Sequence, residues 1–387
     1  MINILYLHAG AEMYGADKVL LELVKGLDKT IYNPIVVLPC DGVLVEKLRE
    51  NNITVEVMEY PILRRKYFNL KGIINYASNY FSSCFKLRKI IKEKNIDIIH
   101  VNTFAVLQGL LLKVTTNAKF VWHIHEIIKS PAILNKVLSK LASIFADETI
   151  VVSKAVKEHL IREANFKNIK VIYNGVDNLI YNPDNEIDYL RKEFNIPQSS
   201  RIIGMIGRVN SWKGQNDFLD AVIPILEKDS SLVAILVGGV FAGEEWRINK
   251  LEKRIAQLEN SDQFRLIPFR DDPQNFHNLF DIFVLPSTNP DPLPTVVLEA
   301  MATGKPVIGY RHGGVCEMVK ENENGLLCTP CEPSELSNCI QTVLYDESLL
   351  KMFSENSLYR QKNLFSLNSY ITNFSNVYSN LKGERHE

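Results

Sequence analysis

The sequence contains no apolar run that approaches the roughly 18 uninterrupted residues of a membrane-spanning helix. Its first apolar stretch, residues 2–7, has only the length of a β-strand, and no cationic segment precedes it. This pattern is not typical of a secretory signal peptide. We therefore expect a cytoplasmic protein.

Net charge is also nearly absent, because 44 basic and 45 acidic residues leave a formal charge of −1. A chain without a global positive excess gives no general case for nucleic-acid binding. A hydrophobic content of 46% and a charged content of 23% are ordinary for a globular protein. With 387 residues, the chain is long enough for two domains with sizeable cores.

Disulfide and metal-binding patterns are missing as well. Six cysteines are too few for a disulfide framework in a chain of this length. Cys328 and Cys331 form a C-x-x-C pattern, but it lacks the second ligand pair that a zinc site requires. Pro330 and Pro333 bracket Cys331, so the strand-to-helix setting of a redox motif is missing too. We interpret this pattern as a loop.

What the sequence does contain is a regular alternation of strand-length and helix-length apolar patterns. In the first half, strands are expected near residues 2–8, 34–38, 53–58, 97–101, 119–123, 148–152 and 169–172. Such alternation predicts a parallel, doubly wound sheet. A second series starts at Arg201. The expected organisation is an N-terminal domain at 1–175, a polar linker at 176–200, a second domain at 201–364 and a last helix at about 365–387.

Residues 281–310 read as strand, loop, helix and strand. The strand covers 282–285, Pro294 marks the start of the helix, and Gly304 followed by Lys305-Pro306 ends it. The loop lies where a parallel α/β sheet holds its ligands. Free backbone N–H groups at Thr295 and Val296 would form an anion site at the helix start.

Glu299 is the only ionised side chain between Pro294 and Gly304, and it lies four residues after Thr295 on the same helix face. A carboxylate on so apolar a helix needs polar partners, which the hydroxyl groups of a ligand could supply. A solvated or capping glutamate is the alternative.

A basic loop follows the strand that starts at Arg201. Arg208 and Lys213 each lie next to a glycine, in front of the next expected helix. Two cations beside a helix N-terminus suit a pyrophosphate, since arginine offers a fork and lysine a point charge. A solvated basic loop would show the same pattern.

In the first domain, two strand ends carry candidate ligand contacts. His125 and Glu126 come just after the strand at 120–123, and a structural role of His125 is the alternative. Gly10 and Gly15 lie between the first strand and its helix, where glycine permits a close approach of the backbone to a ligand. The spacing is not G-x-G-x-x-G, so a dinucleotide site has little support.

Residues 61–94 differ from the rest of the chain, because nine basic residues face a single acidic one, Glu93. The basic residues are Arg64, Arg65, Lys66, Lys71, Lys86, Arg88, Lys89, Lys92 and Lys94, and six aromatic residues are interleaved with them. This composition suggests a surface for anionic membrane lipids. A surface helix whose aromatic residues face the core is the alternative.

Asp291 and Glu299 flank seven residues, and Glu299 opens an E-A-M-A run. This segment resembles the acidic motif of family 4 nucleotide-sugar glycosyltransferases. The resemblance implies that Glu299 binds the ribose hydroxyls of the donor, that Asp291 lies near the donor sugar, and that Leu293, Thr295 and Val296 line the donor site. The family usually has glutamate at the first position and glycine at the position of Pro294.

The resemblance extends over nearly the whole chain. It implies that Arg208 and Lys213 bind the diphosphate, that His125 touches the donor sugar, and that the Gly15 loop faces the diphosphate and acceptor. Arg270, after a later strand, would lie near the base. Arg208, Lys213, His125 and Asp291 are thus the expected catalytic set.

As a fold, the resemblance implies a GT-B architecture, in which two Rossmann-like doubly wound domains face each other across a cleft and the last helix crosses back onto the first. As an activity, it implies transfer of a sugar from a nucleotide diphosphate, a UDP-sugar above all, with retention of configuration. The acceptor would be a glycan or a polyprenyl-linked sugar of a bacterial capsule or O-antigen pathway, at the inner face of the cytoplasmic membrane. No cofactor is expected, and no metal, because the sequence has no D-x-D loop.

Two other functions remain open. A nucleotide-sugar 2-epimerase shares this architecture and needs no acceptor. A subunit of a glycan assembly complex that binds nucleotide without transferring sugar is compatible with the altered Asp291 and Pro294.

Overall fold

The computed structural model describes residues 1–64 and 67–383 and divides into two compact units. The first unit comprises Met1–Gly175 together with the described part of Leu367–Glu387, and the second comprises Val176–Ser366. Arg65 and Lys66 of the basic segment lie outside the described residues. None of the helices in the described ranges combines the length and the apolar composition that a membrane crossing requires.

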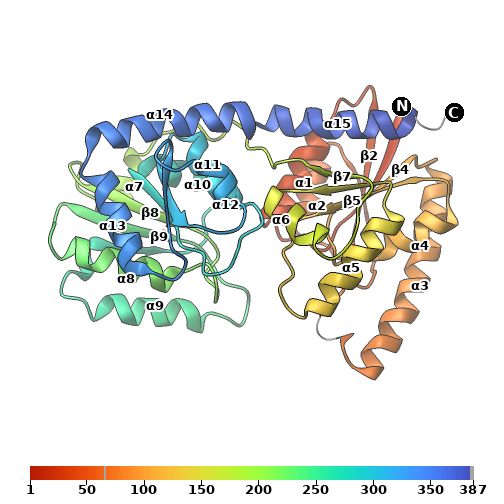
Figure 1. Cartoon of the computed structure of the whole chain (residues 1–387), viewed down its shortest axis with the longest axis horizontal. Coiled ribbons are helices and arrows are strands. Elements are labelled where there is room, and N and C mark those ends of the chain that lie inside the picture. The colour runs from red at the N-terminus through yellow and green to blue at the C-terminus, as the bar shows by residue number, and fades with distance from the viewer. Residues whose placement is uncertain (65–66, 384–387) are drawn as a thin grey trace. The chain divides into compact units, whose positions relative to one another are not determined.

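The first unit is built on a sheet of seven parallel strands (Figure 1). Their order is β3-β2-β1-β4-β5-β6-β7: β2 and β3 are added on one side of β1, and β4 to β7 on the other. The strands of this described sheet are β1 (Ile2–Leu7), β2 (Tyr32–Leu38), β3 (Thr54–Val57), β4 (Ile98–Val101), β5 (Lys119–Ile124), β6 (Glu148–Val151) and β7 (Ile169–Val171). The carboxyl ends of β1 and β4 form the switch point where such sheets bind ligands.

Helices connect these strands because parallel neighbours need a crossover. They are α1 (Gly15–Gly26), α2 (Val43–Glu50), α3 (Leu70–Glu93), α4 (Gln108–Thr115), α5 (Ala132–Phe145) and α6 (Lys154–Ile161). Helix α1 illustrates why the sequence folds this way. Its apolar residues recur at helical spacing, and Val19, Leu20, Leu23 and Val24 are all buried against the sheet.

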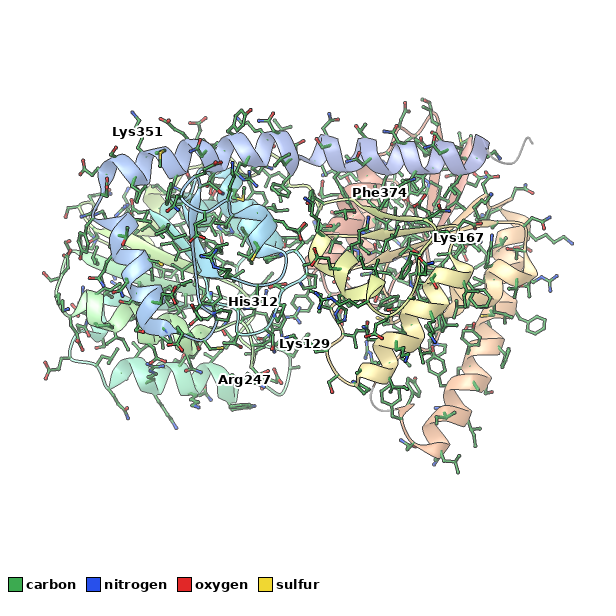
Figure 2. The ribbon with its side chains drawn as sticks, in the orientation of Figure 1. Lys129, Lys167, Arg247, His312, Lys351 and Phe374 are labelled. Atoms are coloured by element: carbon green, nitrogen blue, oxygen red, sulfur yellow. The ribbon has the colours of Figure 1, made fainter. Side chains whose placement is uncertain are left out.

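The last helix, α15 (Leu367–Gly383), belongs to the first unit although it follows the second unit in the chain. Tyr378 of α15 accepts a hydrogen bond from the Tyr6 hydroxyl at 3.1 Å, and Phe374 packs against the rings of His100 and His123. Phe374 is completely buried and is labelled in Figure 2. The helix thereby completes the core of the first unit.

The second unit has a sheet of six parallel strands in the order β10-β9-β8-β11-β12-β13. These described strands are β8 (Arg201–Ile206), β9 (Leu232–Val237), β10 (Phe264–Ile267), β11 (Ile282–Leu285), β12 (Val307–Tyr310) and β13 (Gly325–Cys328). Its helices are α7 (Asp188–Glu193), α8 (Gln215–Leu226), α9 (Trp246–Ala256), α10 (Pro273–Leu279), α11 (Thr295–Ala302), α12 (Val315–Met318), α13 (Pro333–Leu344) and α14 (Glu347–Leu364), with a 3₁₀ turn at Ser261–Gln263. Two Rossmann-like parallel sheets are thus present, and the expected fold class is confirmed.

The range 176–200, expected as a polar linker, is instead part of the second unit. It contains α7, and the side chains of Leu190 and Ile196 are buried. Val176 also forms a β-bridge with Ser366 at the other end of the unit. The linker prediction was wrong because a few buried apolar residues in a mostly polar segment were enough to attach it to the sheet.

Candidate functional site

The loop between β8 and α8 places the two predicted basic residues of the second unit. The Asn210 side chain accepts hydrogen bonds from the backbone N–H groups of Trp212 and Lys213 at 3.0 and 2.9 Å, which folds the loop back on itself. Gly214 then adopts a φ of 83°, and an added Cβ would lie 1.8 Å from the carbonyl oxygen of Pro286. Only glycine fits there, so the chain enters α8 in close contact with the end of β11.

Lys213 and Asp291 form an ion pair between the loops that follow β8 and β11. Their side chains are 14% and 9% exposed, and the Lys213 ammonium also lies 4.7 Å from the centroid of the Trp212 ring. Because β8 and β11 are neighbours at the switch point of this sheet, the pair lies where the fold binds ligands. Both residues were predicted as site residues, but their pairing was not.

Arg208, the other predicted cation, starts the same loop. Its guanidinium carbon lies 3.9 Å from the centroid of the Phe241 ring, a cation–π contact that orients the planar group. Its backbone carbonyl accepts a hydrogen bond from the Gln215 side chain at 3.0 Å, which fixes the loop to the first turn of α8. The loop therefore presents two cations on a defined backbone.

The predicted anion site corresponds to the start of α11. Pro294 was expected as the first helical residue but is the N-cap residue, just before the helix. Thr295 and Val296 are the first two helical residues. Leu293, just before this turn, is 5% exposed. The N–H groups of the first turn have no partner within the helix, so they can donate hydrogen bonds to an anion.

Glu299, one turn further along α11, is 4% exposed, and its Oε2 lies 3.2 Å from Nε2 of His277 on α10. His277 is itself completely buried. The alternative of a solvated glutamate is therefore wrong. Burying a carboxylate costs free energy unless it has polar partners, and His277 is such a partner for Glu299.

Arg270, the predicted neighbour of the base, lies within a local ion network. Its guanidinium contacts Glu193 at 2.6 Å and Asp272 at 2.9 Å. The hydrogen bonds that Arg270 donates to Asp272 and Glu193 raise the pKa of its guanidinium further above its usual value. Two carboxylates thus hold the side chain against α7, and its contact with a base stays a prediction.

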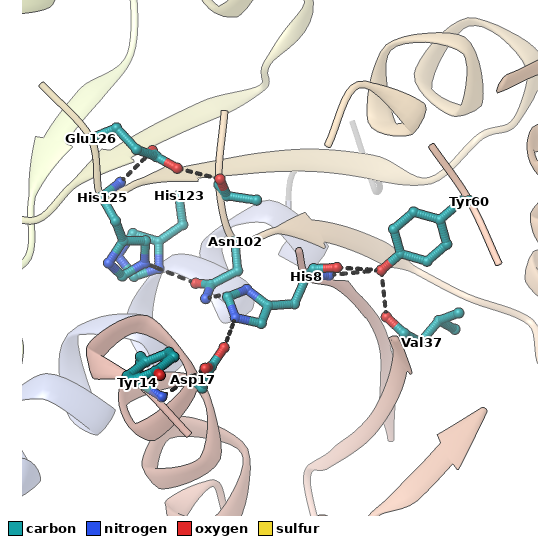
Figure 3. Close-up of polar contacts among 10 residues, drawn as sticks. His8, Tyr14, Asp17, Val37, Tyr60, Asn102, His123, His125 and Glu126 are labelled. Atoms are coloured by element: carbon teal, nitrogen blue, oxygen red, sulfur yellow. Dashed lines mark hydrogen bonds and ion pairs between the residues drawn. The ribbon is translucent and has the colours of Figure 1, made fainter. Parts of the chain in front are cut away.

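In the first unit, His125 ends a chain of hydrogen bonds that crosses the carboxyl ends of β1, β4 and β5 (Figure 3). Nε2 of His8 lies 2.5 Å from Oδ1 of Asp17, and Nδ1 of His8 lies 3.2 Å from Nδ2 of Asn102. Oδ1 of Asn102 in turn lies 3.0 Å from Nε2 of His125. Burial lowers the pKa of His125 to about 3, so its ring is neutral at pH 7.

Glu126 fixes the backbone beside this ring. Its carboxylate accepts hydrogen bonds from the backbone N–H groups of His125 at 3.0 Å and Phe104 at 3.3 Å, and from the Thr103 hydroxyl. Burial raises the pKa of Glu126 above its usual value. Gly15, the remaining predicted contact, is the first residue of α1, two residues before Asp17.

Comparison with known proteins identifies both units. Residues 13–178 match the family described as Glycosyltransferase Family 4, and residues 186–360 match the one described as Glycosyl transferases group 1. The chain contains the domains of a GT-B glycosyltransferase. The resemblance first recognised at Asp291 and Glu299 is thereby confirmed at the level of these domains.

Related glycosyltransferases cover different shares of the chain. A D-inositol 3-phosphate glycosyltransferase of Corynebacterium efficiens is 27% identical over 223 residues, which are 56% of this chain and about half (52%) of that protein. The N-acetyl-alpha-D-glucosaminyl L-malate synthase of Bacillus anthracis is 24% identical over 80% of this chain and 81% of that protein. The crystal structure of Anabaena HepE in complex with UDP has a TM-score of 0.85 at 26% identity and covers 98% of this chain and 100% of that one.

The sequence did not single out several polar residues of these glycosyltransferase domains, namely His8, Asn102 and His277. For His8 and Asn102 a signal existed, because each directly follows a β-strand and the carboxyl ends of parallel strands share one edge. His277 gave no such signal, because it meets Glu299 only once α10 packs against α11. Within the described residues, no group of three or more His, Cys, Asp or Glu side chains is arranged to hold a metal ion.

Proposed function

We propose that the protein transfers a sugar from a nucleotide diphosphate, with a UDP-sugar as the donor, to a glycan or lipid-linked acceptor with retention of configuration. The observation that carries the proposal is the buried Lys213–Asp291 pair beside the start of α11, on which Glu299 is buried. It combines a cation and free N–H groups for a diphosphate with carboxylates for hydroxyl groups. Anabaena HepE, solved with UDP and with UDP-glucose, supports the choice of donor.

Each group has a distinct task in this reaction. Lys213, Arg208 and the N–H groups of α11 would stabilise the negative charge that develops on the diphosphate as its bond to the sugar breaks. The acceptor oxygen would form its bond to the anomeric carbon on the face that the diphosphate leaves. The acceptor proton would pass to the departing phosphate oxygen, so no side chain has to act as the base, and no metal or cofactor is called upon.

Asp291 and Glu299 would bind hydroxyl groups. Lys213 donates a hydrogen bond to Oδ2 of Asp291. Oδ1 of Asp291 would accept a hydrogen bond from a hydroxyl of the sugar. Glu299 would accept hydrogen bonds from the ribose hydroxyls, with His277 holding its other side. His125 would contact the donor sugar.

Thermal unfolding with UDP, GDP, dTDP and CMP tests the donor site. A ligand at about 100 times its Kd adds roughly 2.7 kcal/mol to the free energy of unfolding, which gives a measurable rise in Tm. We expect UDP to raise the Tm of the wild type and to have little effect on Glu299→Gln or Lys213→Met. Lys253→Ala removes an exposed lysine of α9 and serves as the matched control that keeps the UDP effect. Equal shifts in all four proteins would exclude Glu299 and Lys213 from the site.

Turnover distinguishes the proposal from its alternatives. With a UDP-sugar and a panel of glycan and lipid-linked acceptors, a transferase releases UDP and forms a product heavier by one sugar, whose anomeric configuration NMR reports. A 2-epimerase converts the donor without any acceptor. A subunit that has lost turnover binds UDP and does neither.

A surface of the first unit supports a peripheral membrane association, which we include in the proposal. Helix α3 exposes apolar side chains, among them Leu70, Ile74, Phe81 and Phe85, whereas its buried face includes Cys84, Leu87 and Ile91. Phe81 and Phe85 therefore do not face the core, which is what the membrane hypothesis requires. The same helix carries Lys71, Lys86, Arg88, Lys89 and Lys92, and Lys94 directly follows it.

Helix α5 exposes side chains of the same kinds. Both α3 and α5 pack against α4, and α5 exposes Ile133 and Ile144 to 70% and 71%. Lys136 and Lys140 lie on the same helix. Exposed apolar side chains beside lysines suit a lipid surface with negative head groups, such as the inner face of the cytoplasmic membrane.

Co-sedimentation with vesicles tests this association. We expect wild-type protein to pellet with vesicles that contain anionic lipid and to remain in solution with neutral ones. Phe81→Ser with Phe85→Ser should abolish pelleting, while Tyr359→Ser, an exposed aromatic residue on α14 of the second unit, is the matched control. Failure of the wild type to bind anionic vesicles would refute the membrane part alone.

A further inference from the structure

The hydrogen-bond chain from Asp17 to His125 allows its protons to be assigned one partner at a time. Asp17 begins the chain as a pure acceptor. Its Oδ2 accepts the backbone N–H of Tyr14 at 2.8 Å, and its Oδ1 faces Nε2 of His8 at 2.5 Å. A carboxylate cannot donate, so the proton lies on Nε2 of His8. Nδ1 of His8 faces the side-chain amide nitrogen of Asn102, which can only donate, so Nδ1 carries a lone pair.

Asn102 links His8 to His125 and fixes which of its two side-chain atoms faces each ring. It is completely buried, and its only group that can donate to a lone pair is the amide N–H, which faces Nδ1 of His8 at 3.2 Å. The carbonyl oxygen of Asn102 must then face His125, and Nε2 of His125 lies 3.0 Å away. This oxygen can only accept, so the proton of His125 lies on Nε2.

His123 fits the same assignment. Its Nδ1 lies 3.3 Å from Nε2 of His125, so the one N–H of His125 is shared between Asn102 and His123. Burial keeps the pKa of both rings far below 7, so neither carries a second proton at neutral pH. Among the described residues, the hydrogen bonds of the His125 ring all involve Nε2. In this tautomer Nδ1 carries a lone pair and can accept a hydrogen bond.

We propose that Asp17, His8 and Asn102 are positioning residues that lock His125 in the Nε2–H tautomer and turn its Nδ1 into a hydrogen-bond acceptor for the donor sugar. The proposal deepens the proposed function and rests on the contact of His125 with that sugar. An uncharged acceptor accepts from a hydroxyl and repels the oxygens of a carboxylate. Where the hydroxyl that Nδ1 accepts from is the one that a uronic acid replaces with a carboxylate, the site selects the neutral sugar over the corresponding uronic acid.

The hydrogen bonds accepted by Glu126 add to this selection. Because Glu126 holds the backbone N–H of His125 and two groups of the segment after β4, the ring is fixed in position as well as in tautomer. The chain thus connects the first turn of α1 to the ends of β4 and β5. Its members come from the segments that follow β1, β4 and β5, at one edge of the same sheet.

Nitrogen NMR of histidine-labelled protein tests the tautomer directly, without any need for activity. The wild-type spectrum should show the proton of His125 on Nε2, with the signal assigned by its loss in His125→Asn. In Asp17→Asn an amide N–H faces Nε2 of His8, which should move the His8 proton to Nδ1, rotate the Asn102 amide and place the His125 proton on Nδ1. A wild-type proton on Nδ1, or no change in Asp17→Asn, would overturn the proposal.

Kinetics supply the second readout. With a UDP-hexose donor, Asp17→Asn should reduce kcat/KM about tenfold or more, as expected for one lost hydrogen bond, with UDP affinity unchanged. Its preference for the neutral sugar over the uronic acid should shrink. Asp97→Asn is the matched control, because Asp97 is also buried in this unit but binds the backbone N–H of Asn3 at 3.0 Å. Loss of preference in both variants would refute a specific role, whereas absent turnover in the wild type with the expected tautomer would reject the proposed function only.

Discussion

Acid should destabilise the first unit selectively, because three of its histidines are buried as neutral rings. Burial lowers the pKa of His100 and His125 to about 3 and that of His123 well below 6.5. In the unfolded chain each ring titrates near its ordinary value of about 6.5. Between these values the unfolded state binds more protons, so stability present above pH 6.5 is lost as pH falls toward 3.

The magnitude follows from the size of the shifts. Each histidine removes about 1.4 kcal/mol per pH unit below 6.5, which is about 2 kcal/mol at pH 5. Three such rings together remove about 6 kcal/mol, a large part of the stability of an ordinary domain. Glu126 opposes the trend, because burial raises the pKa of its carboxyl, but one group does not offset three.

Fluorescence of Trp122 can report this unit separately. The chain has three tryptophans, and Trp212→Phe with Trp246→Phe leaves Trp122, which is completely buried in the first unit. Urea midpoints measured from pH 7.5 to 5.0 should fall steeply. His100→Phe keeps a ring of similar volume and should reduce the pH slope by about a third, since one of three groups is removed.

His312→Asn is the control for this experiment, because His312 lies in the second unit and should leave the slope reported by Trp122 unchanged. A urea midpoint that stays constant down to pH 5.0 would show that the buried rings do not titrate as argued. A wild-type slope in His100→Phe would show that the loss comes from other groups.

Three further substitutions probe the local features that build the two units. Gly214→Ala should destabilise the second unit by at least about 2 kcal/mol in urea unfolding, because its φ of 83° and the Pro286 carbonyl exclude a side chain. Tyr378→Phe should cost the first unit about 1–3 kcal/mol in the same assay, since Nδ1 of buried His100 loses the hydroxyl that lies 2.8 Å away. Asn69→Ala should cost about 1 kcal/mol and speed amide exchange in the first turn of α3, whose Gly72 N–H it caps at 2.8 Å. Unchanged midpoints, or unchanged exchange for Asn69, would contradict these assignments.

The sequence by itself determined the secondary structure and much of its order. The apolar run at 282–285 is strand β11, and Pro294 and Gly304 enclose the helix α11 (Thr295–Ala302). The strand at Ile2–Leu7 and the final helix from Leu367 were likewise visible as apolar patterns. These features are local, since side-chain periodicity and the φ restrictions of proline and glycine act over a few residues. The error at 176–200 arose because the burial of Leu190 is not a local property.

Only the tertiary structure decided which predicted residues meet and in which chemical state. Lys213 and Asp291 are 78 positions apart, and they pair because β8 and β11 are neighbours in the sheet. His8 and Asn102 are 94 positions apart and are joined by the pairing of β1 with β4. Strand order depends on the packing of the whole domain, and it determines the burial and the partners that set the charge and tautomer of a histidine. The residue types are therefore written in the sequence, whereas their pairing and protonation follow from the fold.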